Sequence, residues 1–256
     1  MRITTNRNRY ARRALIDLHS HILPGLDDGP DELEGSLAMA RSAVADGIRA
    51  LAATPHVRED YPTTADEMEQ ALQRLRAAVS SEGIELEVVP GGELALERIG
   101  RLGVDELRRF GLGGSDFWLL LEFPYSGWPL GLARLAERLA ADGFGIVLAH
   151  PERNPDVQAV PSRLQEFVDD GMLVQLTASS VDGRLGKRTR DAAFALLDLR
   201  LAHLLASDAH APSIREVGLS AAVEALGDDE LASWLTEDVP AAIVSGSPVP
   251  DRPPAR

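Results

Sequence analysis

Short apolar segments alternate with amphipathic segments along most of this chain, and this alternation restricts the fold more than any other feature. Runs rich in Leu, Val, Ile and Ala predict buried strands at 14–20, 48–54, 85–91, 117–123, 144–150, 172–178 and 201–207. Amphipathic spacing predicts helices at 31–46, 129–142, 162–170 and 184–199, and one from Thr64 to about Gly83. Repeated strand–helix units give parallel strands joined by crossover helices. Seven or eight such units favour a closed barrel over an open sheet.

Local signals mark where several of these helices begin and end. Thr64 and Glu67 have the spacing of a capping box, in which each side chain accepts a backbone N–H of the other residue. Glycines, which tolerate the left-handed backbone of a helix end, follow the helical patterns at Gly47, Gly143 and Gly171. No linker or internal repeat interrupts 14–245, so we predict a single domain there. Residues 1–13 form a short basic arm, and the Pro-rich residues 246–256 form a tail.

The composition excludes several classes of function. The formal charge is −14, from 26 basic and 40 acidic side chains, and such a surface repels nucleic acid and anionic membranes. No segment approaches the roughly 18–20 apolar residues that cross a bilayer, and no apolar signal-peptide core follows the basic arm. We therefore expect a cytoplasmic protein without membrane insertion. The absence of cysteine excludes disulfides, thiolate metal sites and cysteine nucleophiles.

Most of the six histidines fall at the ends of the predicted strands. The residues at such ends are His19, His21, Glu93, Glu122, His56, His150, Asp208 and His210. The carboxyl ends of parallel strands form the edge at which ligands bind in α/β folds, so we predict one site. Taken singly, an H-x-H pair is more often chance than a metal site, and Glu93 could simply cap a turn. His203 lacks a strand-end position, and we interpret it as structural.

The residue types indicate metal binding. Together with Asp28 in the following loop, the set comprises five histidines and four carboxylates, and therefore offers nitrogen and oxygen ligands without sulfur. Such mixed ligation suits Zn, Mn, Fe or Co better than Ca or Mg, which prefer oxygen alone. Nine ligands exceed the needs of one tetrahedral ion. We therefore expect two or three metals that share bridging carboxylates.

The motifs DLHSHILPGLDDGP, ATPH, GGE, LEFP, AHPER, QLTASSVDG and SDAH occur in this order over residues 15 to about 215. In this respect the chain resembles the polymerase and histidinol phosphatase (PHP) superfamily. More narrowly, it is similar to the manganese-dependent bacterial protein-tyrosine phosphatases encoded with capsule or exopolysaccharide genes. The segments ELALERIG, VREDYP and APSIR differ from the sequences that are usual at these positions in the family. They border the expected site, so they bear on substrate preference.

The resemblance implies a distorted (β/α)7-type barrel that holds three metals. One metal would bind His19, His21, Glu93 and Asp208, and a second would bind Glu122 and His150 with Glu93 as a bridge. The third would bind Asp28, His56 and His210. Asp28 and Glu122 stand where other branches of the superfamily have histidine, which favours Mn as the harder ion over Fe or Zn.

We expect hydrolysis of phosphotyrosine by a hydroxide that bridges two metals, and we predict Arg153, Arg215 and His210 as the catalytic residues. A guanidinium can hold two phosphoryl oxygens, although Arg153 and Arg215 could instead be solvated surface residues. Asp17 or Asp27 could orient an imidazole or serve in a turn. Three aromatic residues could line a phosphotyrosine entrance or pack at its rim: Tyr61, Tyr125 and Trp128.

We expect the substrate to be a phosphotyrosine protein, namely a bacterial tyrosine kinase that controls capsule or exopolysaccharide synthesis. The alternatives are a small-molecule phosphatase, such as one for histidinol phosphate, and a non-catalytic metal-bound module that binds phosphoproteins. The negative charge argues against a nucleic-acid partner. The sequence leaves open whether the protein forms an oligomer.

Overall fold

The structure, a computed structural model, describes residues 14–211 and 215–254, and the predicted basic arm at 1–13 lies outside the described residues. The strands are β1 (Leu15–Asp17), β2 (Ile48–Ala53), β3 (His56–Val57), β4 (Glu87–Pro90), β5 (Glu93–Leu94), β6 (Trp118–Glu122), β7 (Gly145–Ala149), β8 (Leu173–Thr177) and β9 (Leu204–Ala206). The helices are α1 (Leu33–Asp46), α2 (Ala65–Ser81), α3 (Leu96–Ile99), α4 (Val104–Arg109), α5 (Leu132–Ala141), α6 (Pro155–Ala159), α7 (Gln165–Asp169), α8 (Ala178–Val181), α9 (Lys187–Asp198), α10 (Ser220–Leu226), α11 (Asp229–Ser233) and α12 (Val239–Ser245).

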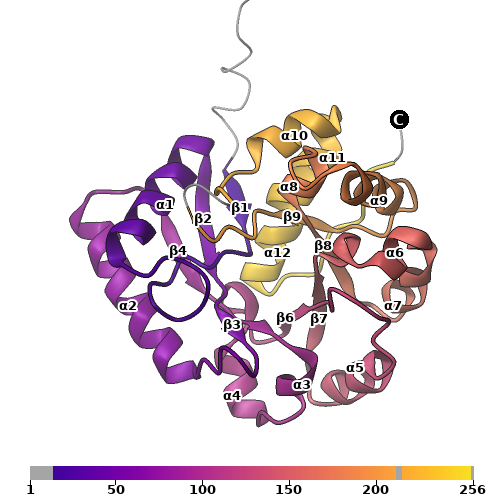
Figure 1. Cartoon of the computed structure of the whole chain (residues 1–256), viewed down its shortest axis with the longest axis horizontal. Helices are drawn as coiled ribbons and strands as arrows, with labels where there is room; N and C mark the ends of the chain where they lie inside the picture. The colour runs from indigo at the N-terminus through magenta and orange to yellow at the C-terminus, as the bar shows by residue number, and fades with distance from the viewer. Residues whose placement is uncertain (1–13, 212–214, 255–256) are drawn as a thin grey trace, which may run out of the picture.

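The strands form a closed ring of seven passes of the chain (Figure 1). Every ladder between neighbouring strands is parallel, in the orders β1-β2-β4 and β3-β5-β6-β7-β8-β9. After a break at Thr54 and Pro55, β2 continues as β3, and β4 likewise continues as β5 after two glycines. A parallel bridge between Ser20 and Ala209 joins the first pass to the last. The predicted closed α/β barrel is therefore confirmed, with a ring distorted where β2 and β4 are interrupted.

One of the two glycines between β4 and β5 is required by packing. A Cβ atom at Gly92 would lie 2.6 Å from the Phe110 ring, which is itself fully buried. No real Cβ contact is that short, so a side chain at this position would push apart the core beside Glu93. The two glycines between β4 and β5 thus allow the chain to pass close to Phe110 and to place the next residue, Glu93, at the end of the barrel.

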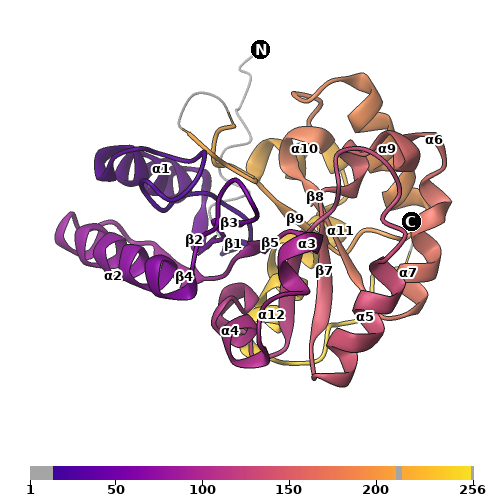
Figure 2. The ribbon, with the colours of Figure 1, turned by 60° about the horizontal axis from the view of Figure 1, so that its bottom comes forward.

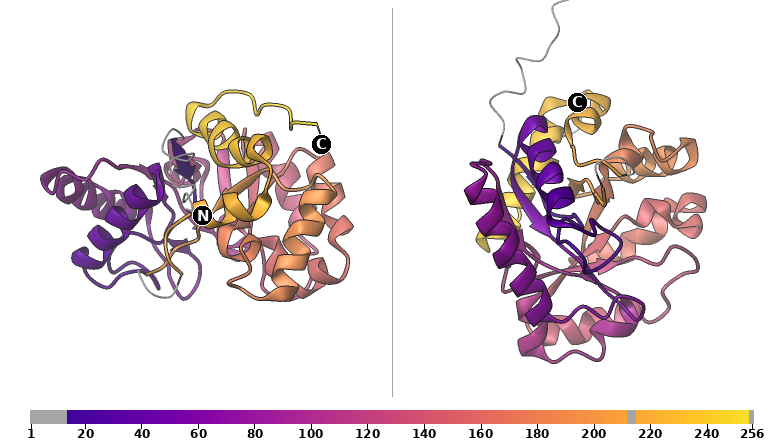
Figure 3. Two further views of the ribbon diagram at one scale, coloured as in Figure 1. Left: turned by 90° about the horizontal axis from the view of Figure 1, so that it is seen from above. Right: turned by 60° about the vertical axis from the view of Figure 1, so that its left-hand side comes forward.

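Helices cover the outside of the ring. In α2 the inward residues Met68, Leu72 and Leu75 are buried, as expected for an amphipathic helix. Figure 2 shows α1 and α2 side by side over the strands of the first sheet, and both helices contact each other and that sheet. Figure 3 (left) shows these indigo and purple helices on one side of the molecule and the pink and orange helices on the other.

The predicted helix signals agree with the structure. The Thr64 side chain accepts the Glu67 N–H, and the Glu67 carboxylate accepts the Thr64 N–H, so the capping box is confirmed. Gly47, Gly143 and Gly171 all have left-handed φ, at 100°, 86° and 89°. The helix predicted at 162–170 is divided, since a 3-10 turn precedes the α-helix α7.

The end of the chain differs from the strand–helix alternation. After two isolated bridges at Ala209 and Ala211, the described residues beyond β9 form the helices α10 to α12, with a π-helical turn at Trp234–Asp238. The described part of the Pro-rich segment then lies against the barrel. The Trp234 indole donates to the Pro250 carbonyl (3.0 Å), and the Arg252 side chain donates to the Leu197 carbonyl (2.9 Å). These bonds fix the segment beside α9.

His203 provides a pH-dependent contribution to stability. Just before β9, its Nδ1 accepts the Val174 N–H at 3.1 Å, in agreement with the structural role predicted for it. Burial and then the nearby Arg252 lower the pKa of His203 to about 4. A histidine with a lowered pKa binds its proton more readily in the unfolded chain, so folding weakens as pH falls from about 6.5 to about 4. We expect a loss on the order of 3 kcal/mol across this window.

Urea unfolding of the wild type and of His203→Gln at several pH values between 4 and 7 measures this effect. The variant lacks a titrating group, so its stability should vary less with pH than that of the wild type. Identical pH profiles for the two proteins would contradict the prediction.

Candidate metal centre

The nine residues predicted as metal ligands meet at the carboxyl edge of the barrel. They lie just beyond β1, β7 and β9, at the end of β6 and at the starts of β3 and β5, and Asp28 lies in the loop before α1. Eight are buried, and the Asp28 side chain is 36% exposed. They are His19, His21, Asp28, His56, Glu93, Glu122, His150, Asp208 and His210. The prediction that these residues converge on one place is therefore confirmed, and their role as ligands stays a prediction.

Glu93 lies at the centre of the cluster. One carboxylate oxygen, Oε2, is 3.4 Å from Nε2 of both His19 and His21, and 2.9 Å from Nδ1 of His56. The other oxygen, Oε1, is 2.7 Å from Nε2 of His150. Burial would raise the pKa of Glu93, but His19 and the other imidazoles hold it well below its usual value. The carboxylate is therefore ionised and surrounded by four of the histidines.

Asp208 contributes a second shared oxygen. Its Oδ1 lies 3.3 Å from Nε2 of His19 and 3.3 Å from Nε2 of His21. Asp208 and His150 both have left-handed backbones, with φ of 50° and 41°. Such conformations are unfavourable for residues other than glycine and concentrate at functional sites. Here they turn each side chain out of its strand toward the cluster.

Asp28, His56 and His210 form the outer part of the cluster. Asp28 Oδ1 is 3.2 Å from Nε2 of His210 and 3.5 Å from Nε2 of His56. The His210 ring also lies 3.9 Å, centre to centre, from the ring of His21. This contact joins the outer part of the cluster directly to its inner part, so the cluster is continuous.

Several buried atoms of the cluster lack a hydrogen-bond partner in the described part of the chain. They include Nε2 of His19, His21 and His210, Nδ1 of His56 and Oε2 of Glu93. Buried polar atoms without partners are costly, so a ligand is expected where they face one another. Ligand atoms about 2.0–2.2 Å from a metal lie about 3.0–3.5 Å apart, as the 3.3–3.4 Å separations here do. The donor set therefore fits transition-metal ions.

The donors form four overlapping groups, each compact enough for one ion. These are His21, Asp28, His56 and His210; His19, Glu93 and His150; His19, His21 and Asp208; and His56, Glu93 and Glu122. The assignment of Glu122 and His150 to one ion, with Glu93 as a bridge, stays a prediction; in the structure Glu122 and His150 each share a compact group with Glu93. Burial and the charge of Glu93 raise the pKa of Glu122, although Arg58 opposes this. Overlap at Glu93 agrees with the expected sharing of a carboxylate.

Polar residues behind the cluster fix the histidine rings. Asp27 Oδ2 is 2.6 Å from Nδ1 of His21. Of the two roles considered for Asp27, orienting an imidazole or serving in a turn, this contact supports the first. Asp17 instead accepts the backbone N–H groups of His19 and Ser207. The Oε1 of Gln175 is 2.9 Å from Nδ1 of His19. Both contacts direct the Nε2 of a histidine toward the cluster.

Gln175 was not among the residues predicted from the sequence. The sequence did contain a signal for it. Gln175 is a polar residue in the middle of the buried strand β8, LVQLT, whose other polar residue is the terminal Thr177. A fully buried amide within an apolar strand requires a specific partner.

Replacing Asp27 by asparagine tests the support of His21. Burial would raise the pKa of Asp27, but His21 holds it below its ordinary value, so the residue is a charged acceptor. Asparagine keeps an acceptor oxygen and loses the charge, and we expect metal affinity to fall by about tenfold or more. Titration of metal-free protein with Mn measures this, and Asp142→Asn at the exposed end of α5 is the control. Equal affinity in the wild type and Asp27→Asn would contradict the prediction.

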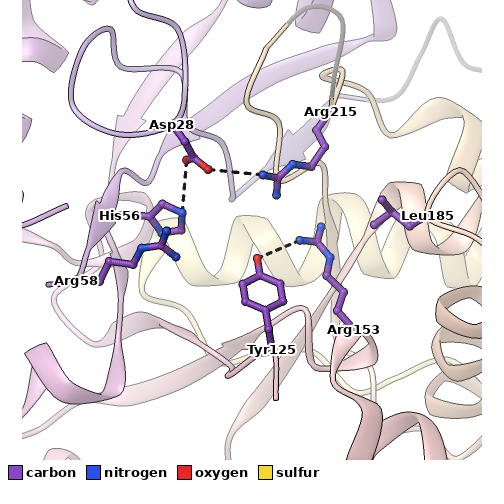
Figure 4. A pocket seen from close by; sticks show the side chains of 7 residues that line it. All are labelled: Asp28, His56, Arg58, Tyr125, Arg153, Leu185 and Arg215. Atoms are coloured by element: carbon purple, nitrogen blue, oxygen red, sulfur yellow. Dashed lines mark hydrogen bonds and ion pairs between the residues drawn. The ribbon is translucent and has the colours of Figure 1, made fainter. Parts of the chain in front are cut away.

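A pocket of about 400 Å³ opens above the cluster (Figure 4). It is lined by Asp28, His56, Arg58, Tyr125, Arg153, Leu185 and Arg215. Arg153 is 2.7 Å from Asp208 Oδ2 and donates to the Thr177 hydroxyl at 2.7 Å. Arg215 is 3.0 Å from the same Asp208 oxygen. The structure thus places both predicted arginines beside the cluster rather than on the outer surface, and the local charge suits an anion.

Arg58 is a third arginine of this pocket that was not predicted. It lies 3.1 Å from Glu122 Oε1 and 2.8 Å from Asp60. Its position two residues after His56 was the available signal, because alternate residues of an extended segment share a face.

The three aromatic residues differ in their positions. Tyr125 stacks on His150 with ring centres 5.5 Å apart, and its hydroxyl is 3.5 Å from Arg153. Tyr61 stacks on His56 at 5.8 Å. Trp128 packs against Phe167 and Arg163 and does not line this pocket. Tyr125 is therefore the aromatic wall of the pocket, and Trp128 has a packing role.

A family model for capsular polysaccharide synthesis, CpsB/CapC, matches residues 15–237 of this chain. The chain belongs to the CpsB/CapC family. Its relatives include the tyrosine-protein phosphatase YwqE of Bacillus subtilis, 35% identical over 88% of this chain and 89% of the relative. The tyrosine-protein phosphatase CpsB of Streptococcus pneumoniae is 26% identical over 77% of this chain and 83% of that protein.

The fold of this CpsB/CapC member is also found among solved structures. One from the work on YwqE of Bacillus subtilis and CpsB of Streptococcus pneumoniae, described as metal-dependent tyrosine phosphatases, matches with a TM-score of 0.82. It is 31% identical and covers 94% of this chain and all of the other. A 5-methylcytosine deaminase from Klebsiella pneumoniae, 14% identical, shares the fold alone, with a TM-score of 0.58 over 91% of this chain and 74% of that one. Among the described residues, none of the helices has the length and apolar character needed to span a membrane.

Proposed function

We propose that this protein is a metal-dependent protein-tyrosine phosphatase. The observation that carries the proposal is a cluster of nine nitrogen and oxygen donors at the floor of a pocket lined by three arginines. Membership of a family whose relatives include the tyrosine-protein phosphatases YwqE and CpsB supports the choice of phosphotyrosine. The arginines supply positive charge for a phosphoryl group, and Tyr125 supplies an aromatic surface for the ring of the substrate.

The proposed metal ligands are His19, His21, Asp28, His56, Glu93, Glu122, His150, Asp208 and His210. We propose three ions, with Mn preferred over Fe or Zn because four of the ligands are carboxylates. When bound, such ions lower the pKa of water and stabilise the charge of a phosphoryl group in transfer. Glu93 would be the shared carboxylate, since it contacts four of the five histidines in the cluster.

The arginines would bind the phosphoryl oxygens. Arg153 holds its guanidinium in place through Thr177 and Asp208, which leaves its planar group oriented before substrate arrives. Arg215 contacts the same Asp208 oxygen and lies near Asp28 and His210. A phenolate leaving group, with a pKa near 10, needs less help from a general acid than an alkoxide does. Charge stabilisation by the chain and its ions can therefore carry most of the reaction.

The protein partner and setting are further parts of the proposal. A bacterial tyrosine kinase that controls capsule or exopolysaccharide synthesis is the proposed substrate, and the cytoplasm is the proposed location. We propose residues 14–245 as the catalytic domain, preceded by the arm at 1–13 and followed by the tail at 246–256.

Hydrolysis of a phosphotyrosyl peptide and of histidinol phosphate, measured side by side, tests the proposed function. The purified protein is assayed after addition of Mn, Fe or Zn, and its metal content is determined by elemental analysis. We expect a higher kcat/KM for the phosphotyrosyl peptide and the highest activity with Mn. A higher kcat/KM for histidinol phosphate would overturn the choice of substrate, and bound metal without hydrolysis of any aryl phosphate would indicate a non-catalytic module.

A further inference from the structure

Two more hollows adjoin the site pocket in turn, one beside the barrel mouth and one on the outside of the barrel. The first, of about 340 Å³, is lined in part by Arg58, Tyr125, Ala95 and Pro124, and it shares Arg58 and Tyr125 with the site pocket. Figure 4 shows Arg58 and Leu185 at opposite sides of the site pocket, so this hollow leaves from the side away from Leu185. It is a continuation of the active-site mouth.

The second hollow lies between α3 and α5 and has a volume of about 370 Å³. Leu96 lines both hollows, so they adjoin on either side of its side chain. The loop before α5 borders the first hollow at Pro124 and the second at Gly131. Shared walls therefore connect the site pocket, the first hollow and the second hollow, and we call these two hollows the side groove.

The far end of the side groove combines apolar and positively charged groups. Leu96 and Leu135 are partly buried against the core, and Arg134 and Arg138 of α5 complete the lining. Neither arginine side chain has a hydrogen bond or ion pair with any described residue. Other arginines of this chain, such as Arg41, Arg101, Arg109 and Arg184, pair with its excess of acidic side chains. Both guanidinium groups are therefore available to an acidic partner.

Acidic residues also lie along the groove. Asp60 and Glu97 line the first hollow, and Asp60 pairs with Arg58 at 2.8 Å. Glu137 is exposed on α5 between the two arginines in sequence. The charge thus changes along the groove, from acidic beside the site to basic at its far end. Leu130, next to Gly131, is 92% exposed and adds an apolar group near that end.

We propose that the side groove binds the polypeptide flanking the phosphotyrosine, and that its far end selects an apolar residue followed by acidic residues. This inference rests on the proposed tyrosine-phosphatase function, because the phosphotyrosine must occupy the site pocket. A hollow of this volume is about 9 Å across, or about three residues of extended chain. The acidic residues should therefore lie about three to six residues from the phosphotyrosine.

Peptide kinetics with variants of α5 test the inference. Four phosphotyrosyl peptides are compared. Each carries a leucine and, farther from the phosphotyrosine, two glutamates or two lysines, either on the N-terminal or on the C-terminal side. For the wild type with Mn we expect about a tenfold higher kcat/KM for the glutamate peptide on one of the two sides. Because exposed charges are screened, the preference should shrink as salt is raised. The variant Arg134→Glu with Arg138→Glu should lose the preference.

Control variants separate the groove from net charge and from folding. Arg74→Glu with Arg188→Glu changes the charge by the same amount at exposed positions on α2 and α9, and it should keep the preference. Arg134→Gln with Arg138→Gln removes the two positive charges without reversing them, and this variant should lose the preference for the glutamate peptide. p-Nitrophenyl phosphate has no flanking chain, so its kcat/KM should change less than twofold in all of these variants.

The outcomes distinguish this inference from the proposed function. If the wild type hydrolyses the peptides without preference, or if the α5 variants keep the preference, the side groove does not select acidic flanks. If the wild type with metal hydrolyses none of the phosphotyrosyl peptides, the proposed function itself fails and the inference fails with it.

Discussion

Replacing Glu93 by glutamine is expected to lower kcat/KM by about a thousandfold or more, since the ions would lose the carboxylate that most of the histidines share. The Glu93 oxygens lie within 3.4 Å of nitrogens of four histidines, whereas Asp208 Oδ1 is shared by only two of these, His19 and His21. A neutral amide binds metal ions more weakly than a carboxylate. We therefore also expect the purified variant to contain less metal, as measured by elemental analysis.

Glu166→Gln is a matched control, because Glu166 is exposed on α7 and the substitution is chemically the same. It should retain the metal content and kcat/KM of the wild type. Full metal content together with wild-type turnover in Glu93→Gln would show that Glu93 is not part of the catalytic centre. Far-UV circular dichroism of both variants checks that the barrel is intact.

Arg153→Ala is the second substitution with a large expected effect, a fall in kcat/KM of about a hundredfold. The Arg153 side chain is only 10% exposed, and Thr177 and Asp208 hold its guanidinium at the edge of the site pocket. Metal content should change little, since arginine is not a metal ligand. Arg153→Lys should recover activity only in part, because an ammonium group cannot form the two parallel hydrogen bonds of a guanidinium.

Inhibition by inorganic phosphate gives an independent measurement for Arg153. If the residue binds phosphoryl oxygens, the inhibition constant for phosphate should rise in Arg153→Ala and rise less in Arg153→Lys. Arg188→Ala on the exposed surface of α9 should change neither value. Unchanged kinetics in both Arg153 variants would remove this residue from the mechanism.

The sequence predicted the barrel and the composition of the cluster because both follow from local periodicity. Buried strands read as apolar runs, and His19, His21 and His150 are polar residues at the ends of such runs. The order of the motifs predicted the family, and the family match confirms it. The capping box at Thr64 depends on residues three positions apart and was equally predictable.

Contacts between strands could not be predicted in the same way. Glu122 shares a compact donor group with His56 and Glu93, which depends on the register of β3, β5 and β6 and on the rotamers at their ends. Gln175 reaches His19 across the barrel from 156 residues away. The two charged hollows beside Leu96 likewise depend on how α3 and α5 pack. Such choices are made by tertiary packing, and no sequence period encodes them.

The bridge between Ser20 and Ala209 has a consequence for the synthesis of this protein. His19 and His21 lie on one side of this junction and Asp208 and His210 on the other, joined by the hydrogen bonds from Asp208 N–H to the His19 carbonyl and from His21 N–H to the Ala209 carbonyl. A ribosome releases the first pair long before it translates the second. The nascent chain therefore lacks Asp208 and His210 through most of translation, and the proposed metal centre can assemble only after the residues that follow β9 have emerged.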